Sequence, residues 1–87
     1  MVEVREIPLN QIHRPLPRVN DQKKVAALME SIQVEGLHEP IDVLEVDGKY
    51  YGFSGCHRYE ANQRLGKGTI RARVRRAPRS VLQRHLA

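Results

Sequence analysis

The chemically reactive residues of this chain gather around its one cysteine, Cys56, which stands between Gly55 and the pair His57 and Arg58. The aromatic run before them predicts a strand, and the residues after them predict a helix over 58–65. At the start of a helix, the first backbone N–H groups have no helical partner and the helix dipole is positive. The junction at Cys56 therefore suits an anion, either a bound phosphate or a thiolate.

A second candidate for anion chemistry is Arg14, which is followed by Pro15, Leu16 and Pro17. Each proline biases the residue before it away from the helical region, so this segment is predicted to be extended and stiff. An arginine held on such a segment loses little further entropy when it meets an anion.

The clearest predicted helix is capped by Asn20 or Asp21, runs to about Glu35 and ends at Gly36. Its apolar residues recur at helical spacing and predict one buried stripe: Val25, Leu28, Met29 and Ile32. Lys24 lies in the first turn, where the helix dipole disfavours a cation, so its side chain is either solvated or faces a phosphate.

The remaining elements are predicted from apolar alternation and turn residues. We place strands at residues 2–8, 41–46, 49–53 and 70–75, a single turn at 9–12, and a last helix from a cap at Ser80 to Leu86. Asp47 and Gly48 join the second and third strands as a hairpin, because both residues tolerate positive φ. The sequence therefore predicts one small α/β (α+β) domain over residues 1–87, with a mixed β-sheet flanked by helices.

Length and composition limit the kinds of site that are possible. A chain of 87 residues has no room for a deep enclosed cavity, so any site is expected in a surface groove. One cysteine excludes an internal disulfide, and four histidines without ligand spacing predict no protein-held metal. The sequence has no signal core, transit-peptide bias or apolar run of membrane length, which predicts a cytoplasmic, reducing compartment and no membrane partner.

The net charge of +5 is concentrated near the end of the chain, where six arginines fall between residues 71 and 84. Such a charge suits an anionic partner, such as nucleic acid, a nucleotide or an acidic protein. The alternative is a solvated basic face, and the composition leaves both interpretations open. Apolar Ile70, Ala72 and Val74 alternate with the arginines, which is typical of a half-buried strand and not of an aromatic platform for single strands.

Three segments carry a family resemblance: Arg14-Pro15-Leu16-Pro17, Pro40-Ile41-Asp42-Val43-Leu44 and Phe53-Ser54-Gly55-Cys56-His57-Arg58. In this order and with these spacings, they resemble the sulfiredoxins, the ATP-dependent reductases of over-oxidised peroxiredoxins. The resemblance runs from about residue 7 to about residue 70. It implies the α/β fold of the sulfiredoxin and ParB-like superfamily.

The resemblance also implies a reaction. The sulfinate of an over-oxidised 2-Cys peroxiredoxin attacks the γ-phosphate of ATP, which arrives with Mg²⁺ bound mainly to its phosphates, and a sulfinic phosphoryl ester forms. The Cys56 thiolate then displaces phosphate and leaves a thiosulfinate bridge between the two proteins. Glutathione or thioredoxin is the expected external thiol reductant.

Roles follow from the same resemblance, one residue at a time. Cys56 matches the catalytic cysteine, and Arg14 matches an arginine placed near the reacting phosphoryl group, with Asp42 in a position to orient it.

Nucleotide contacts are also implied. Gly55, His57 and Arg58 match the loop and helix start that hold ATP phosphates, and Lys24 and Ser31 match residues of the first helix that contact the nucleotide. No metal ligand is expected from the protein.

This chain departs from the family pattern at two points. Ala27 stands where some members have a serine that helps to bind nucleotide, so the resemblance does not carry the nucleotide contact over to this position. Some members also have a second, resolving cysteine, and this chain has only Cys56. A monomer that relies on an outside thiol is expected.

An alternative interpretation belongs to another functional class. Gly55-Cys56-His57-Arg58 also satisfies the Gly-x-x-Arg phosphate pattern of ParB-like nucleotide-binding and DNA-partitioning modules. Cys56 would then be incidental, and the arginine-rich end would bind DNA. The cysteine at the helix start, and a length that leaves no space for a helix-turn-helix region, favour the reductase and predict no nucleic-acid partner.

Overall fold

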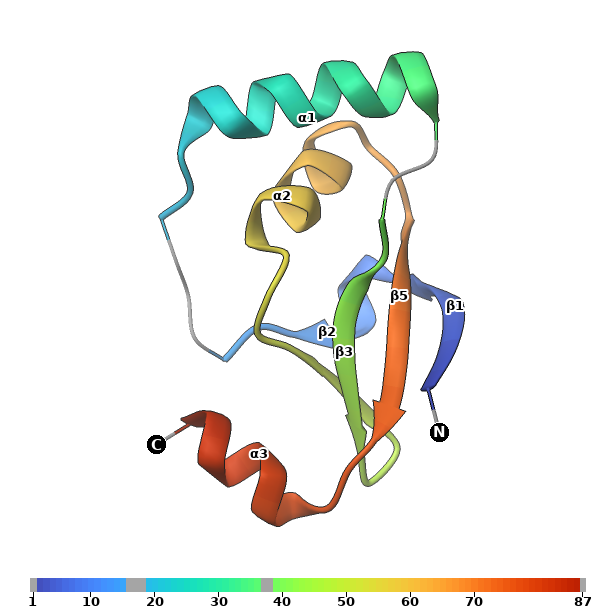
Figure 1. The fold of residues 1–87 in the computed structure, drawn as a ribbon, viewed down its shortest axis with the longest axis vertical. Coiled ribbons are helices and arrows are strands. Elements are labelled where there is room, and N and C mark those ends of the chain that lie inside the picture. The colour runs from blue at the N-terminus through green and yellow to red at the C-terminus, as the bar shows by residue number, and fades with distance from the viewer. Residues whose placement is uncertain (1, 16–18, 37–38, 87) are drawn as a thin grey trace.

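The computed structural model describes residues 2–15, 19–36 and 39–86 (Figure 1). Leu16 and Pro17 of the predicted extended segment, and one of the four histidines, His38, lie outside the described residues. The elements in chain order are β1 (Val2–Pro8), the 3₁₀ helix η1 (Leu9–Gln11), β2 (Ile12–His13), α1 (Gln22–Glu35), β3 (Ile41–Val46), β4 (Lys49–Gly52), α2 (Cys56–Arg64), β5 (Thr69–Arg76) and α3 (Arg79–Leu86).

The five strands form one sheet in the order β1-β5-β3-β4-β2. β1 pairs with β5 and β3 with β4 in antiparallel fashion, whereas β3 pairs with β5 and β2 with β4 in parallel. The sheet is therefore mixed, and the predicted fold class is confirmed. β3 lies at its centre, and β5 is an inner strand between β1 and β3. Ile70, Ala72 and Val74 bury one face of β5 while arginines alternate on the other.

The hairpin between β3 and β4 turns at Asp47 and Gly48, as predicted. Both residues have positive φ, 52° and 77°, which is the combination that suits a two-residue turn between twisted strands. The hairpin directs the chain from β4 toward α2.

The apolar core has two parts. One lies on a single face of the sheet and contains Ile7, Leu9, Ile12, Ile41, Val43, Ile70, Ala72 and Val74. The other joins the two neighbouring helices, where Val25 and Ile32 of α1 meet Ala61 of α2. Half-buried Leu28 and Met29 pack against this second cluster, so the predicted stripe of α1 is confirmed.

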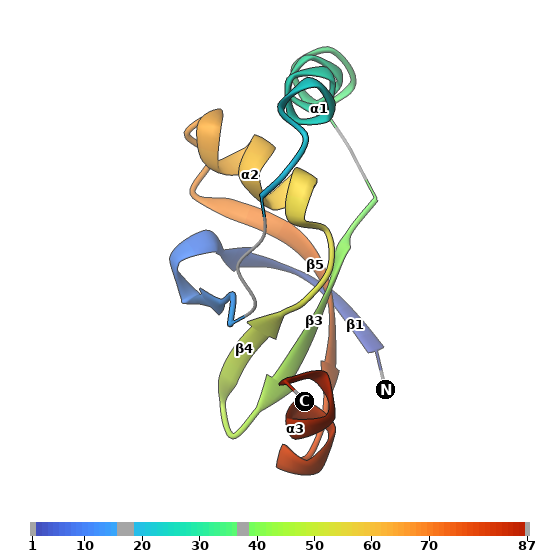
Figure 2. The ribbon, with the colours of Figure 1, turned by 90° about the vertical axis from the view of Figure 1, so that its left-hand side faces the viewer.

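The helices lie at opposite ends of the molecule. α1 and α2 lie together at one end, and α3 lies at the other, against β3 (Figures 1 and 2). Among the described residues, no helix has the length and apolar character needed to cross a membrane.

The structure corrects three local predictions. Ile12 was expected to belong to a turn, but it forms with His13 the strand β2, which pairs with β4. Two residues are too few to show the alternation from which a strand is predicted. α2 begins at Cys56 and not two residues later. The last helix begins at Arg79, where Val81 N–H already donates to the backbone O of Pro78 at 3.0 Å, so Ser80 lies inside the helix and is not its cap.

Candidate active site

Cys56 is the first residue of α2, directly after the residue that caps the helix. Gly55 has left-handed backbone angles, φ 67° and ψ 30°, and its carbonyl accepts the first helical bond, from Tyr59 N–H at 2.9 Å. The N–H groups of Cys56, His57 and Arg58 precede this bond and lie outside the helical ladder. Together with the helix dipole, they make the position favourable for an anion.

Only glycine fits at position 55. A Cβ atom there would stand 2.3 Å from Cγ2 of Ile41 in β3, and the positive φ is strained for any other side chain. Gly55 therefore lets the start of α2 lie directly on the sheet, which places the thiol beside the first residue of β3.

The guanidinium of Arg14 contacts the thiol. Its Nη2 donates to Cys56 Sγ at 2.9 Å, and its Nη1 donates to the backbone O of Ser54 at 2.9 Å. The same group lies over the ring of Tyr59, 5.0 Å from the centroid, and the Tyr59 hydroxyl donates to the backbone O of Leu9 at 3.1 Å. These contacts hold a cation in a fixed position beside the sulfur of Cys56.

The short strand β2 positions Arg14 beside Cys56. Ile12 and His13 pair in parallel with Tyr50 and Tyr51 of β4, so Arg14 follows directly after the pair and lies beside Gly52. A Cβ atom on buried Gly52 would stand 2.6 Å from Arg14 Nη1. The absence of a side chain at position 52 therefore makes room for the guanidinium.

The start of α1 is tied to the start of α2. Asp21 N–H donates to Nε2 of His57 at 3.2 Å, and Nδ2 of Asn20 donates to the backbone O of Cys56 at 3.2 Å and to Glu60 at 2.9 Å. Asp21 also accepts from Lys23 N–H at 2.9 Å and so caps α1, as predicted. Two helix N-termini thus meet beside the thiol.

Glu60 is the anion that holds this junction together. Asn20 and Gln22 both donate to its carboxylate, at 2.9 Å and 3.0 Å, and Arg64 lies 3.8 Å away. The hydrogen bonds from Asn20 and Gln22 lower the pKa of the Glu60 carboxyl below its ordinary value, because they stabilise the charged form.

A groove of about 470 Å³ opens at this junction, a volume within the range of small-molecule sites. It is lined by Leu28, Glu39, Pro40, Ile41, Asp42, Phe53, Ser54, Gly55, Cys56, His57, Arg58 and Arg73. A second groove of about 480 Å³ shares Asp42, Phe53, Ser54 and Arg73 with the first and continues along β3 to His85, which stacks on Phe53 at 4.7 Å. The site is an open surface groove, as expected from the length of the chain.

The residues expected to bind nucleotide fall into two groups. Gly55, His57 and Arg58 line the groove. Lys24 and Ser31 lie on α1, two helical turns apart and so on one side of that helix, outside the lining of the groove. Lys24 is exposed and forms no ion pair with any residue of the described ranges.

Asp42 was expected to orient Arg14, but it binds a different arginine. Its Oδ1 accepts from Nε of Arg73 at 3.0 Å, and this hydrogen bond raises the pKa of Arg73 above its ordinary value. Arg14 is instead oriented by Ser54 and Tyr59. Within the described part of the chain, no three His, Cys, Asp or Glu side chains group together in a way that could hold a metal ion.

Sequence reasoning missed three residues of this site. Gly52 was placed in a strand without a role, although a glycine inside a strand signals close approach of another group. Tyr59 and Glu60 lie on a polar helix without a motif, and their partners, Arg14 and Asn20, are about 40 residues away. No local pattern marks such contacts.

Comparisons with known proteins identify the family of this chain. A model of the ParB N-terminal domain family matches residues 1–86. The chain is 59% identical over 83 residues to the chloroplastic/mitochondrial sulfiredoxin of Arabidopsis thaliana, which covers 93% of this chain and 66% of that protein. The crystal structure of sulfiredoxin from Arabidopsis thaliana matches with a TM-score of 0.94 and 56% identity, over 98% of each chain.

A more distant structure shares the fold. The C-terminally truncated chromosome-partitioning protein ParB of Caulobacter crescentus, complexed with CTP-γ-S, matches with a TM-score of 0.70 and 30% identity, over 86% of this chain and 45% of that chain.

Proposed function

The chain belongs to the sulfiredoxin family, within the ParB N-terminal domain family, and we propose that it reduces cysteine-sulfinic acid in over-oxidised 2-Cys peroxiredoxins with the use of ATP. The observation that carries the proposal is the contact of Arg14 Nη2 with Cys56 Sγ at the first residue of α2. It combines a nucleophile, a fixed cation and a helix start that favours phosphate.

ATP with Mg²⁺ would supply the phosphoryl group that activates the sulfinate. The groove supports this assignment by its volume and by the N–H groups of Cys56, His57 and Arg58, which precede the first helical hydrogen bond. Gly55, His57 and Arg58 would hold the phosphates, and Lys24 and Ser31 would contact the rest of the nucleotide from α1. The residues of this chain would leave the magnesium ion to the phosphates and water.

Activation is required because a sulfinate is an anion without a good leaving group. Once the sulfinyl sulfur carries a phosphoryl ester, the Cys56 thiolate attacks that sulfur, the S–O bond breaks and phosphate leaves. Arg14 stands next to both the nucleophile and the groove, so it neutralises charge on the departing oxygens. The product is a thiosulfinate bridge, which an external thiol such as glutathione or thioredoxin then opens.

The protein substrate would use the second groove. A peroxiredoxin that brings its sulfinate to Cys56 must contact the surface next to it, and the second groove joins the first at Phe53 and Ser54. Half-buried Tyr51 and Phe53 and buried Leu44 give this groove an apolar character. It therefore suits a protein segment better than a second charged ligand.

Cell compartment and assembly state remain predictions. The Arabidopsis thaliana relative is a chloroplastic/mitochondrial sulfiredoxin. For this chain, we predict a reducing compartment, the cytoplasm, and a monomeric state.

The proposal is tested by intact-mass spectrometry of a sulfinic 2-Cys peroxiredoxin incubated with this protein, Mg-ATP and glutathione. Wild-type protein is expected to remove oxygen from the sulfinate until the thiol state is restored. Cys56→Ser is expected to lose at least nine tenths of the rate while it still binds ATP, because serine is a far weaker nucleophile at neutral pH. Unchanged peroxiredoxin mass with the wild type, or full activity of Cys56→Ser, would refute the proposal.

A further inference from the structure

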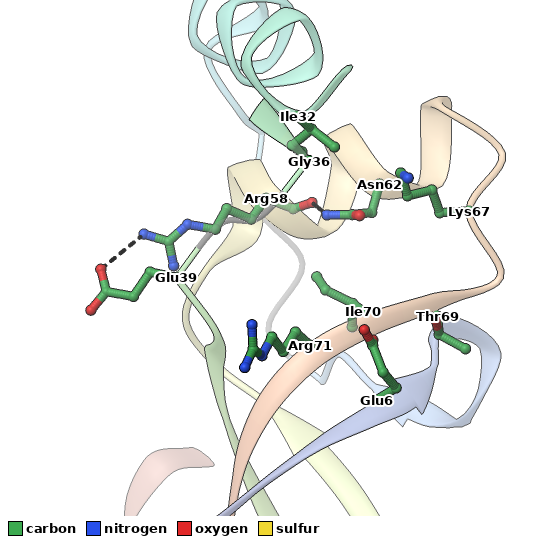
Figure 3. Close-up of a pocket in the computed structure, with 10 residues that line it drawn as sticks. All are labelled: Glu6, Ile32, Gly36, Glu39, Arg58, Asn62, Lys67, Thr69, Ile70 and Arg71. Carbon is green, nitrogen blue, oxygen red and sulfur yellow. Dashed lines mark hydrogen bonds and ion pairs between the residues drawn. The ribbon is translucent and has the colours of Figure 1, made fainter. Parts of the chain in front are cut away.

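Glu39 lies between two arginines at the edge of the groove. Its Oε2 is 3.7 Å from Nη2 of Arg58, and its Oε1 is 3.5 Å from Nη1 of Arg73. Figure 3 shows the side chain of Arg58 extended from α2 toward Glu39, with the ion pair drawn as a dashed line. A carboxylate of the chain thus occupies the position that an anionic ligand of Arg58 would otherwise take.

The two arginines are held differently. Arg73 is fixed by a hydrogen bond to Asp42 at 3.0 Å, so it stays in place as an anchor for Glu39. Arg58 has one ion-pair partner among the described residues, Glu39, at a distance too long for a strong hydrogen bond. Arg58 is therefore the member of this cluster that can turn to another anion.

Arg58 stands at a boundary between two hollows. It lines the groove around Cys56 and also the smaller pocket of about 170 Å³ drawn in Figure 3, and Glu39 lines both as well. A turn of the Arg58 side chain toward the start of α2 would exchange Glu39 for a ligand in the groove.

We propose that Glu39 is the resident counter-ion of Arg58, which nucleotide phosphates must displace, and that Glu39 thereby lowers the affinity of the site for ATP. This inference rests on the proposed binding of phosphate by Arg58. Two effects act in the same direction. The Arg58–Glu39 pair has to break, and the freed carboxylate, still held by Arg73, repels the phosphates in the groove.

The expected size of the effect is modest because Glu39 is 65% exposed and water screens its charge. Glu39→Gln removes the charge and keeps the shape of the side chain. We expect it to tighten Mg-ATP binding about two- to tenfold at low salt, with a smaller gain at about 0.3 M salt.

The experiment is isothermal titration calorimetry of Mg-ATP into wild-type protein, Glu39→Gln and the control Glu30→Gln. Glu30 is exposed on α1 and has no ion pair with a described residue, so its variant has the same net charge and should bind like the wild type. The same titration is then carried out with Arg58→Met and with the double variant Arg58→Met/Glu39→Gln. Most of the increase in Mg-ATP affinity caused by Glu39→Gln should vanish in the Arg58→Met background, because the guanidinium that Glu39 would otherwise hold is no longer present.

A second measurement needs no nucleotide. The side-chain Nε–Hε resonance of Arg58, assigned by its loss in Arg58→Met, should shift in ligand-free Glu39→Gln and stay in place in Glu30→Gln.

Three results would overturn the inference while the proposed function stands: wild-type binding with no gain in Glu39→Gln, an equal gain in Glu30→Gln, or a gain that persists in full without Arg58. An unmoved Arg58 resonance would overturn it whether or not ATP binds. Wild-type protein that binds no Mg-ATP would refute the proposed function, and the inference with it.

Discussion

Gly52 and Arg14 lie so close together that a Cβ atom on the glycine would stand 2.6 Å from Nη1 of the arginine. Gly52 is buried in β4, and Ile12 is the other near neighbour of such an atom, at 3.1 Å. The nearest atom is the tip of a flexible side chain, so the guanidinium is the group that would have to move. The contact between Arg14 and Cys56 thus depends on a residue that touches neither sulfur nor groove.

Gly52→Ala is expected to displace Arg14 from Cys56 and to lower the rate of sulfinate reduction about a hundredfold, the lower end of the range for loss of one oxyanion donor. The destabilisation should be modest, about 1–3 kcal/mol, as for other overpacked sites. Gly68→Ala is the matched control, because nothing lies within 4 Å of a Cβ atom there. Steady-state rates and thermal unfolding of both variants test this prediction. Wild-type activity of a folded Gly52→Ala would contradict the role of Gly52 in placing Arg14.

The junction between α1 and α2 should weaken in acid through Glu60. Its pKa is lowered in the folded protein by hydrogen bonds from Asn20 and Gln22, so below the ordinary value of 4.5 the unfolded chain binds the proton first. The contribution of Glu60 to the free energy of unfolding is therefore complete above that value and is lost as the pH falls through the folded-state pKa.

Denaturant unfolding between about pH 6 and about pH 3 should show a shallower loss of stability in Glu60→Gln than in the wild type. Glu30→Gln, which removes a charge from an exposed and unpaired position, serves as the control. Parallel pH profiles of Glu60→Gln and the wild type would exclude this role.

A covalent complex should accumulate when no outside thiol is present. The chain has one cysteine, so a thiosulfinate on Cys56 cannot be opened from within. With Mg-ATP and a sulfinic peroxiredoxin that lacks its other cysteines, a heterodimer is expected on a non-reducing gel, at no more than one equivalent and sensitive to reductant. Several turnovers without thiol and without this band would show that the covalent route is wrong.

Duplex DNA should bind weakly, because carboxylates already pair with much of the arginine-rich end. Arg73 pairs with Asp42 and Glu39, Arg76 lies 3.7 Å from Glu45, and Arg79 pairs with Asp47. Fluorescence anisotropy should give weak affinity that falls steeply with salt, as for simple charge neutralisation. Sub-micromolar affinity at about 200 mM salt would instead favour the DNA-partitioning alternative.

The regular elements were accessible from the sequence because their signals are local. The stripe of α1, the cap at Asp21, the Asp47-Gly48 turn and the apolar alternation of β5 each fall within a short window, and each predicted the observed element. The placement of Cys56 at a helix start was predicted for the same reason.

The partners of the site residues were not accessible, because they depend on tertiary placement. Asp42 lies on β3 within reach of both the groove and β5, and only the parallel pairing of these strands, with Asp42 opposite Arg73, decides which arginine it meets. The link from Asn20 to Glu60 likewise joins two helix starts whose approach no pattern in either helix specifies.

The two-residue strand β2 has a consequence for the motions of the site. It is an edge strand held to β4 by the pairs at Ile12 and His13 alone, whereas β1 and β5 pair along seven positions. Segments with few backbone hydrogen bonds open locally at a small fraction of the global unfolding free energy. The backbone amides of β2 are therefore expected to exchange with solvent sooner than those of β5, and such an opening would release Arg14 from sulfur.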